Sequence, residues 1–270
     1  MKFPAFGMDT GFYSPLGSYS LDARCEMLAE LGYDATYLTL WSDTAWADLP
    51  ELGKTAARHG LGVAAVNVTV DASAPLDEGE NARILTMIDT LSCGQTVEIA
   101  IRHGGDVRPF LERALDAAEA NEVRLLLYPH TFFWMERAED AIRLCEEFGS
   151  PRLGLVFSAF HWYAVEGTDL RKTLQAASPY LGLVNLCGSR RLAGQYFPTT
   201  IEPLDSGDLD NFALLGALRA LSYTGMVGVQ GYGVGGDAYD RYRRSITTLR
   251  ELEDRLDAHP EWAELRPDHI

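Results

Sequence analysis

Short runs of apolar, β-branched and aromatic residues alternate along this chain with longer stretches of helical period. Several of the short runs are almost continuously apolar, which is typical of strands that are buried on both faces. Strands alternating with helices predict a parallel sheet covered by helices. The alternation recurs about eight times, with strands expected at 3–9, 35–40, 62–68, 97–102, 123–128, 153–157, 181–186 and 226–231.

The stretches between these strands carry the helical period. Helices are expected at 21–31, 107–119, 136–148, 209–221 and 239–256. Gly32 and Gly225 follow two of them, where a left-handed residue commonly ends a helix. Eight such units in 270 residues predict one α/β domain, a single (β/α)8 TIM barrel over 1–257, with 258–270 as a surface tail.

Charge and composition narrow the expected partners. The formal net charge is −16, which disfavours phosphate backbones and anionic membrane surfaces. The four cysteines form no CxxC pair, and no stretch approaches the length of a membrane span or a signal peptide. We therefore expect a cytoplasmic protein that binds a small molecule, with no nucleic acid or membrane as partner. The pattern does not predict the oligomeric state.

Histidines follow three consecutive predicted strands. His103, His130 and His161 occupy these positions, and in a TIM barrel the active site lies at the carboxyl ends of the strands. One histidine at a strand end is often only a surface or hydrogen-bonding residue, but three on neighbouring strands indicate a shared site. Trp134 and Trp162, just after two of the strand ends, are candidates to stack against a ligand.

Four segments resemble a known family in their order and spacing. They are 125–130 (LLLYPH), 154–161 (GLVFSAFH), 184–186 (VNL) and 221–230 (LSYTGMVGVQ). The chain is similar to the xylose isomerase-like sugar isomerases and epimerases, a family that also includes the endonuclease IV relatives. The resemblance implies a TIM barrel that acts on sugars. It also implies one divalent metal, held by two glutamates, an aspartate and a histidine.

The chain departs from the family at those four positions. The resemblance places the ligands at Tyr128, Ser158, Asn185 and Gln230, and it retains the histidine of the family's Asp-x-x-His motif as His161. Hard divalent cations need carboxylate charge, which these four side chains lack. We therefore expect no metal cofactor, and a sugar-like substrate bound by hydrogen bonds from Ser158, Asn185 and Gln230. Arg191 stands where some epimerases of the family bind substrate with an arginine.

The resulting hypothesis is an isomerase, epimerase or lyase that acts on a small polyhydroxylated or carbonyl compound. Its catalytic candidates are His103, His130, His161 and Tyr128, with histidine as the acid and base. Two alternatives stay open. The chain is a small-molecule binding protein that has lost catalysis, or its three histidines form a new metal site with an open position.

Overall fold

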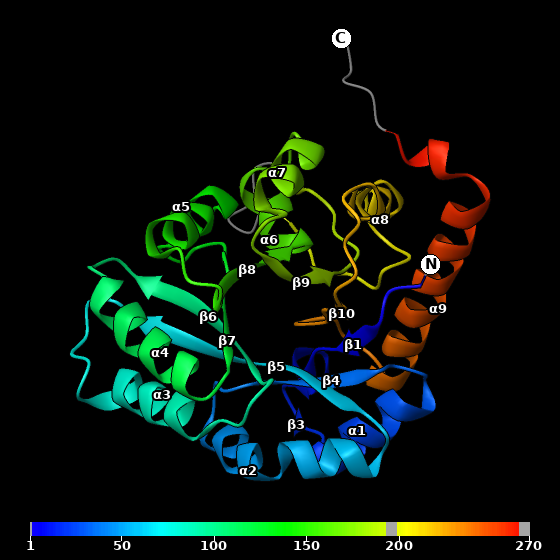
Figure 1. Ribbon diagram of the computed structural model, residues 1–270. Coiled ribbons are helices and arrows are strands. Elements are labelled where there is room, and N and C mark those ends of the chain that lie inside the picture. Colours follow the sequence, from blue (N-terminus) through cyan, green and yellow to red (C-terminus); the bar gives the residue numbers. More distant parts are fainter. Residues whose placement is uncertain (1, 193–198, 265–270) are drawn as a thin grey trace.

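The computed structural model describes residues 2–192 and 199–264. Eight parallel strands close into a barrel in the order β1-β10-β9-β8-β7-β6-β5-β4, with helices around it (Figure 1). The predicted (β/α)8 barrel is confirmed, and each predicted strand overlaps an observed one. The strands are β1 (Ala5–Gly7), β4 (Ala35–Thr39), β5 (Gly62–Asp71), β6 (Thr96–His103), β7 (Arg124–Leu127), β8 (Leu153–Ser158), β9 (Leu181–Leu186) and β10 (Val227–Val229).

Helices connect these strands and cover the barrel. Several begin at a side-chain cap: the hydroxyls of Ser20 and Ser42, for example, accept hydrogen bonds from the backbone N–H groups of Ala23 and Ala45. The helices are α1 (Leu21–Glu30), α2 (Asp43–Arg58), α3 (Gly79–Thr90), α4 (Arg108–Ala120), α5 (Ala138–Phe148), α6 (Ala159–Val165), α7 (Leu170–Ala177), α8 (Asn211–Ala220) and α9 (Ala238–Ala258). A short 3-10 helix, η1 (Asp9–Phe12), and a small hairpin of β2 (Tyr13–Ser14) and β3 (Gly17–Ser18) follow β1.

The two predicted glycine turns differ in the structure. Gly32 has the expected left-handed conformation, with φ of 80°. After α8, Ser222 is the left-handed residue, with φ of 57°, so the prediction for Gly225 is wrong. Gly225 is instead required for space, because a Cβ there would lie 2.4 Å from the hydroxyl oxygen of Tyr223.

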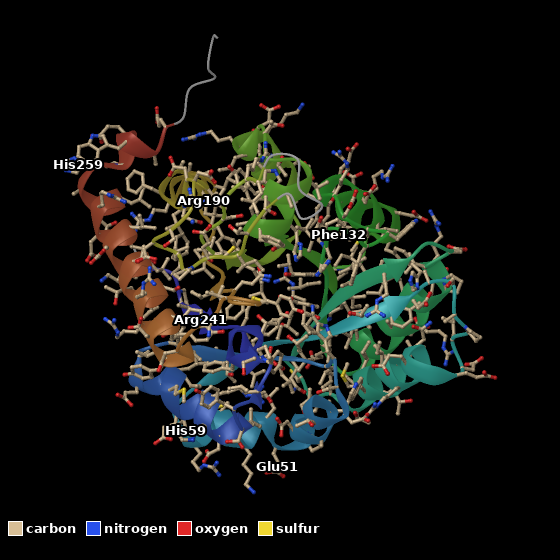
Figure 2. All side chains as sticks on the ribbon, turned by 180° about the vertical axis from the view of Figure 1, so that it is seen from behind. Glu51, His59, Phe132, Arg190, Arg241 and His259 are labelled. Atoms are coloured by element: carbon tan, nitrogen blue, oxygen red, sulfur yellow. The ribbon has the colours of Figure 1, made fainter. Side chains whose placement is uncertain are left out.

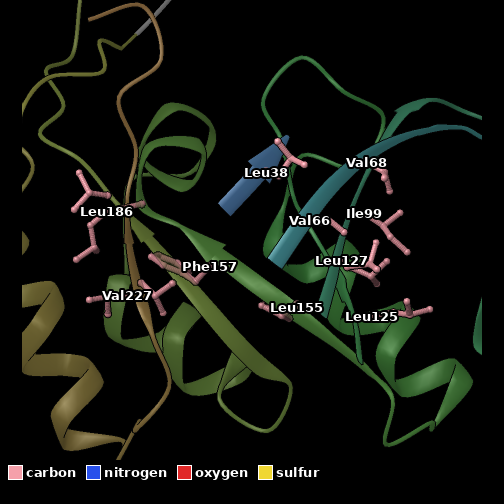
Figure 3. Close-up of a cluster of buried hydrophobic side chains, with 14 of the residues drawn as sticks. Leu38, Val66, Val68, Ile99, Leu125, Leu127, Leu155, Phe157, Leu186 and Val227 are labelled. Carbon is pink, nitrogen blue, oxygen red and sulfur yellow. The ribbon is translucent and has the colours of Figure 1, made fainter. Parts of the chain in front are cut away.

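Alternate residues of each strand face opposite sides of the barrel wall. The outward-facing set packs against the helices, and Figure 3 shows part of it, including Leu38, Val66, Ile99, Leu127 and Phe157. A second cluster fills the barrel interior, with Phe6, Tyr37, Ala65, Ala100, Leu126, Tyr128, Val156 and Leu183 among its members. This alternation decides which residues near a strand end can reach the barrel mouth.

The C-terminal segment packs in part on the barrel. A 3-10 helix, η2 (Pro260–Ala263), follows α9, and Ala263 is buried against α8, where a Cβ on Gly216 would collide with it. Residues 265–270 of the predicted tail lie outside the described residues. No helix within 2–192 and 199–264 is both long and apolar enough to cross a membrane.

Candidate active site

The carboxyl ends of the strands surround a large cleft of about 1400 Å³. A small inner cavity continues it toward the barrel interior, where Tyr37, Asn67 and Tyr128 line it. The two spaces share a set of residues that we call the neck: Trp41, Thr69, His130, Phe133, His161 and Gln230. The neck therefore joins the open cleft to the polar groups inside the barrel, and its titratable side chains are the two histidines.

The backbone of Thr131 orients both histidines of the neck. Nδ1 of His130 lies 2.8 Å from the carbonyl oxygen of Thr131, so this nitrogen carries a proton and Nε2 has a free lone pair. The N–H of Thr131 donates to Nδ1 of His161 at 3.2 Å, so in the neutral ring the proton lies on Nε2. The buried Nε2 of His161 has no hydrogen-bond partner among the described residues. The ring centroids lie 4.0 Å apart, so the pair brings an acceptor, Nε2 of His130, close to an unused donor, the Nε2–H of His161.

Both imidazoles are neutral at physiological pH. Burial is the main cause that lowers the pKa of His130 to about 4, and the positive charge of Arg102 lowers it further, while the hydrogen bond to Thr131 opposes the shift. The pKa of His161 lies well below its ordinary value because the ring is buried and because His130 lies beside it. Two neutral rings can accept and donate protons without first losing a charge.

The structure does not bring His103 to this pair. On β6, Val97, Ile99 and Ile101 face the helices, whereas Ala100 faces the barrel interior. Arg102 lies on the same face of the strand as Ala100 and lines the cleft, whereas His103 lies on the opposite face. The exposed His103 ring lies 2.7 Å from a carboxylate oxygen of Asp71. The described residues contain no group of three or more histidine, cysteine or acidic side chains that could hold a metal. A three-histidine metal site is therefore not formed.

The four positions at which the resemblance places metal ligands lie at or near the barrel interior. Tyr128 is buried directly after β7, and its ring makes an edge contact with His161. Ser158 and Asn185 are register neighbours on β8 and β9, and both lie beside Tyr128. Gln230 follows β10 and lines the neck. The oxygens of Ser158, Asn185 and Gln230 are buried without a hydrogen-bond partner in the described structure.

This donor set does not fit a hard divalent cation. Burial raises the pKa of Tyr128, so its hydroxyl stays protonated. The serine and the two amides carry no charge, and Mg²⁺ and Ca²⁺ are normally held by carboxylate oxygens. Gln230 can exchange hydrogen bonds with a neutral ligand in the neck. Ser158 and Asn185 line neither the cleft nor the inner cavity, so the structure does not bring these two predicted substrate-binding residues to a ligand.

Glu98 is a buried carboxylic acid that the sequence analysis missed. It lies on β6 in the barrel interior, accepts a hydrogen bond from the hydroxyl of Tyr37, and lies 3.5 Å from the amide nitrogen of Asn67. Burial raises the pKa of Glu98 to about 7, against the opposing hydrogen bonds. The one available sequence signal is a single acidic residue inside the apolar run 97–101, where a charge would normally be excluded.

The cleft arginine differs from the predicted one. Arg191 donates a hydrogen bond to the carbonyl oxygen of Tyr163 at 3.0 Å and stacks over the Tyr163 ring, and it is not part of the cleft lining. Arg102 lines the cleft near His130 and lies over the Phe133 ring. In the part of the chain that the structure describes, Arg102 has no carboxylate partner. Its guanidinium is therefore available to a ligand in the cleft, which Asp71 and other carboxylates also line.

The aromatic residues of the cleft also differ from the predicted ones. Trp162 is buried in the core against Phe157, at 5.8 Å between ring centroids, and Trp134 is half exposed but outside the cleft lining. Neither is placed to stack on a ligand in the cleft. Trp41 and Tyr232 line the cleft instead. Each directly follows a predicted strand, 35–40 and 226–231, and this position is the sequence signal that marks them.

The chain belongs to the xylose isomerase-like TIM barrel family, whose model matches residues 25–252. Among curated proteins, none shows significant sequence similarity to it. Solved structures with the same fold include an L-ribulose 3-epimerase, at 16% identity and a TM-score of 0.70 over 98% of this chain and 99% of that one. A D-allulose 3-epimerase from Methylomonas sp. in complex with D-allulose matches at 14% identity and a TM-score of 0.68, covering 93% and 97% of the two chains. The IOLI protein, with a bound zinc atom, matches at 17% identity and a TM-score of 0.73, covering 94% and 99%.

Proposed function

We propose that this protein isomerises a small polyhydroxylated carbonyl compound, a sugar or sugar derivative, without the divalent metal of its family. Family membership and the sugar epimerases that share its fold support the substrate class. The observation that carries the proposal is the pair of neutral imidazoles in the neck, one with a free lone pair and the other with a free N–H. The neutral groups at the former metal positions support the absence of the metal.

The chemistry follows from the two tautomers. Nε2 of His161 would donate a hydrogen bond to the substrate carbonyl, and Nε2 of His130 would remove the proton from the neighbouring carbon. The cation of Arg102 would stabilise the negative charge of the resulting enediolate, a role that a metal ion often has. The same His130 then returns the proton to the adjacent carbon. Nε2 of His161 gives its proton to the former carbonyl oxygen. It takes up the proton of the neighbouring hydroxyl, which becomes the new carbonyl.

One base favours isomerisation over inversion of a carbon. A single base on one face of the substrate can move a proton between neighbouring carbons, whereas inversion needs proton-transferring groups on both faces. In the neck, His130 is the base. Gln230, after β10, stands where the resemblance places a glutamate, and its amide cannot take up a proton at neutral pH. The aldose–ketose type of reaction is therefore the one we propose.

Solvent exchange tests this directly. A panel of aldoses and ketoses is incubated with the protein in D₂O, and deuterium at the carbon next to the carbonyl is followed by ¹H NMR. We expect exchange with at least one sugar, and a loss of roughly 100-fold or more in the His130→Gln variant, as for removal of a general base. His103→Gln is the matched control and should exchange at the normal rate. Binding without exchange would identify a binding protein instead.

A further inference from the structure

The cleft is much larger than its reactive part. Its volume of about 1400 Å³ exceeds the range of roughly 300–1,000 Å³ that is typical of sites for drug-sized ligands. The two histidines lie at the neck, where the cleft narrows toward the barrel interior. A single sugar ring over His130 and His161 would leave the outer part of the cleft unfilled.

Aromatic side chains form two walls of this outer part. Trp41, which lines both the neck and this outer part, follows β4, and Tyr232 follows β10. Both strands pair with β1, so the two rings meet above the end of β1 with centroids 5.8 Å apart. They remain 48% and 53% exposed, so both rings have free surface for a ligand. Phe132, labelled in Figure 2, is 48% exposed and follows β7, which lies opposite β1 in the closed strand order. The walls therefore face each other across the barrel mouth.

Carboxylates also line this cleft. Asp43, Glu78 and Glu80 line the same outer part of the cleft, at the beginnings of α2 and α3. Aromatic rings offer flat apolar surfaces, and carboxylate oxygens accept hydrogen bonds from hydroxyl groups. A sugar ring presents both a flat face of C–H groups and a rim of hydroxyls. Asp43 is already paired with Arg83 and Glu80 accepts a hydrogen bond from Trp46, but a carboxylate has further lone pairs, which sugar hydroxyls would use and a purely aromatic substituent would not.

We propose that the outer part of the cleft binds a second sugar ring, so that the substrate is a two-ring glycoside whose reacting ring lies over the histidines. This inference rests on the proposed function and specifies its substrate class. Trp41 and Tyr232 would stack against the apolar face of the second ring, and the acidic residues would accept hydrogen bonds from its hydroxyls.

Calorimetric titration of the full chain tests the proposal. The probes are glucose and galactose, the disaccharides cellobiose, maltose and lactose, and phenyl β-D-glucopyranoside. We expect the Kd of at least one disaccharide to be at least tenfold lower than that of glucose or galactose. Trp41→Ala and Tyr232→Ala should remove this advantage. Trp262→Ala is the matched control, because Trp262 is also exposed but stacks on His259, which Figure 2 shows far from Phe132.

Each other outcome overturns a defined part of the proposal. Equal affinity for monosaccharides and disaccharides, or an advantage that survives in the Trp41 and Tyr232 variants, would exclude a second-ring subsite there while leaving the proposed isomerisation intact. Tighter binding of the phenyl glucoside than of every disaccharide would assign the walls to an aromatic substituent. If no sugar binds and no sugar exchanges in D₂O, the proposed function fails as well. Thermal unfolding of each variant, followed by circular dichroism, verifies that it is folded.

Discussion

The imidazole rings of His130 and His161 lie 4.0 Å apart, and the backbone of the single residue Thr131 fixes them in opposite tautomers. The carbonyl of Thr131 requires a proton on Nδ1 of His130, whereas its N–H requires a lone pair on Nδ1 of His161. A proton on either ring would place positive charge in a buried site next to the other. The fold therefore favours two neutral rings, and the proposed chemistry also requires them.

The stability of the fold should fall in mild acid because of this pair. The pKa of His130 is about 4 in the folded protein and about 6.5 in the unfolded chain, so the unfolded chain binds more protons between these values. The contribution is present above pH 6.5 and is lost as the pH falls toward 4, by on the order of 3 kcal/mol. Urea unfolding at a series of pH values measures it.

Variants assign this loss to the pair. His130→Gln should flatten the stability curve between pH 6.5 and 4, whereas His103→Gln, which changes an exposed ring, should leave it unchanged. If the curves of the natural protein and the His130 variant run parallel, His130 titrates normally and is not the buried neutral base inferred above.

Ionisation of Glu98 should lower the stability of the folded protein as the pH rises, opposite to the effect of His130. The pKa of Glu98 is raised from 4.5 to about 7, so the folded protein binds more protons than the unfolded chain between these values. Stability from this group is fully present below pH 4.5 and is lost as the pH rises through 7. Glu98→Gln removes the ionisation, and we expect a gain on the order of 1–3 kcal/mol at pH 8 and little change at pH 4.

Unfolding by urea at both pH values checks the Glu98 prediction. Glu112→Gln is the matched control, because Glu112 is exposed on α4. A Glu98 variant that is less stable than the natural protein at pH 8 would mean that the ionised carboxylate is stabilised inside the barrel, which contradicts the raised pKa.

The barrel could be predicted from the sequence because strands that are buried on both faces consist of nearly continuous apolar residues. The sequence also predicted that His130 and His161 would meet, since they follow β7 and β8, which are neighbours in the barrel. His103 was misplaced by the parity of one strand: a shift of one residue changes the face of a side chain, so Arg102 reaches the cleft and His103 does not.

Other parts of the site depend on contacts between distant residues. Glu98 is stabilised by Tyr37, which lies 61 residues away in the sequence, and no local pattern indicates this pairing. Trp162 and Trp134 both follow strand ends, but only the packing of α6 and of the segment after β7 decides that one is buried and that neither lines the cleft. The prediction of site residues therefore failed where the face of a strand residue, or contacts between distant segments, decided the outcome.

Restoring the family's ligands should restore metal binding. The variant Tyr128→Glu, Ser158→Asp, Asn185→His, Gln230→Glu places three carboxylates and one imidazole where these four side chains converge, and such donors suit Mn²⁺ or Zn²⁺. We expect about one metal per chain in this variant, and substoichiometric metal in the natural protein. Elemental analysis after equilibration with MnCl₂ and desalting measures both. Stoichiometric metal in the natural protein would contradict the interpretation that these positions have lost their ligand function.

Arg102 should contribute to the low pKa of His130, after burial, and to the rate of turnover. Its charge is one of the causes that lower the His130 pKa, so Arg102→Gln should raise that pKa toward 6.5, as followed by the pH dependence of the imidazole proton signals in NMR. A more basic His130 would by itself favour proton removal. Because the guanidinium would also stabilise the enediolate, however, we expect the variant to lose roughly 100-fold in kcat on an exchanging sugar, with a smaller change in KM.

Arg83→Gln is the control for this prediction, because Arg83 lines the same cleft but is paired with Asp43. It should leave the His130 pKa and kcat close to those of the natural protein. An Arg102 variant with unchanged kcat and a raised His130 pKa would separate the two effects, since the arginine would then tune the base without stabilising the intermediate. A loss confined to KM would instead assign Arg102 to substrate binding and remove it from the proposed replacement of the metal.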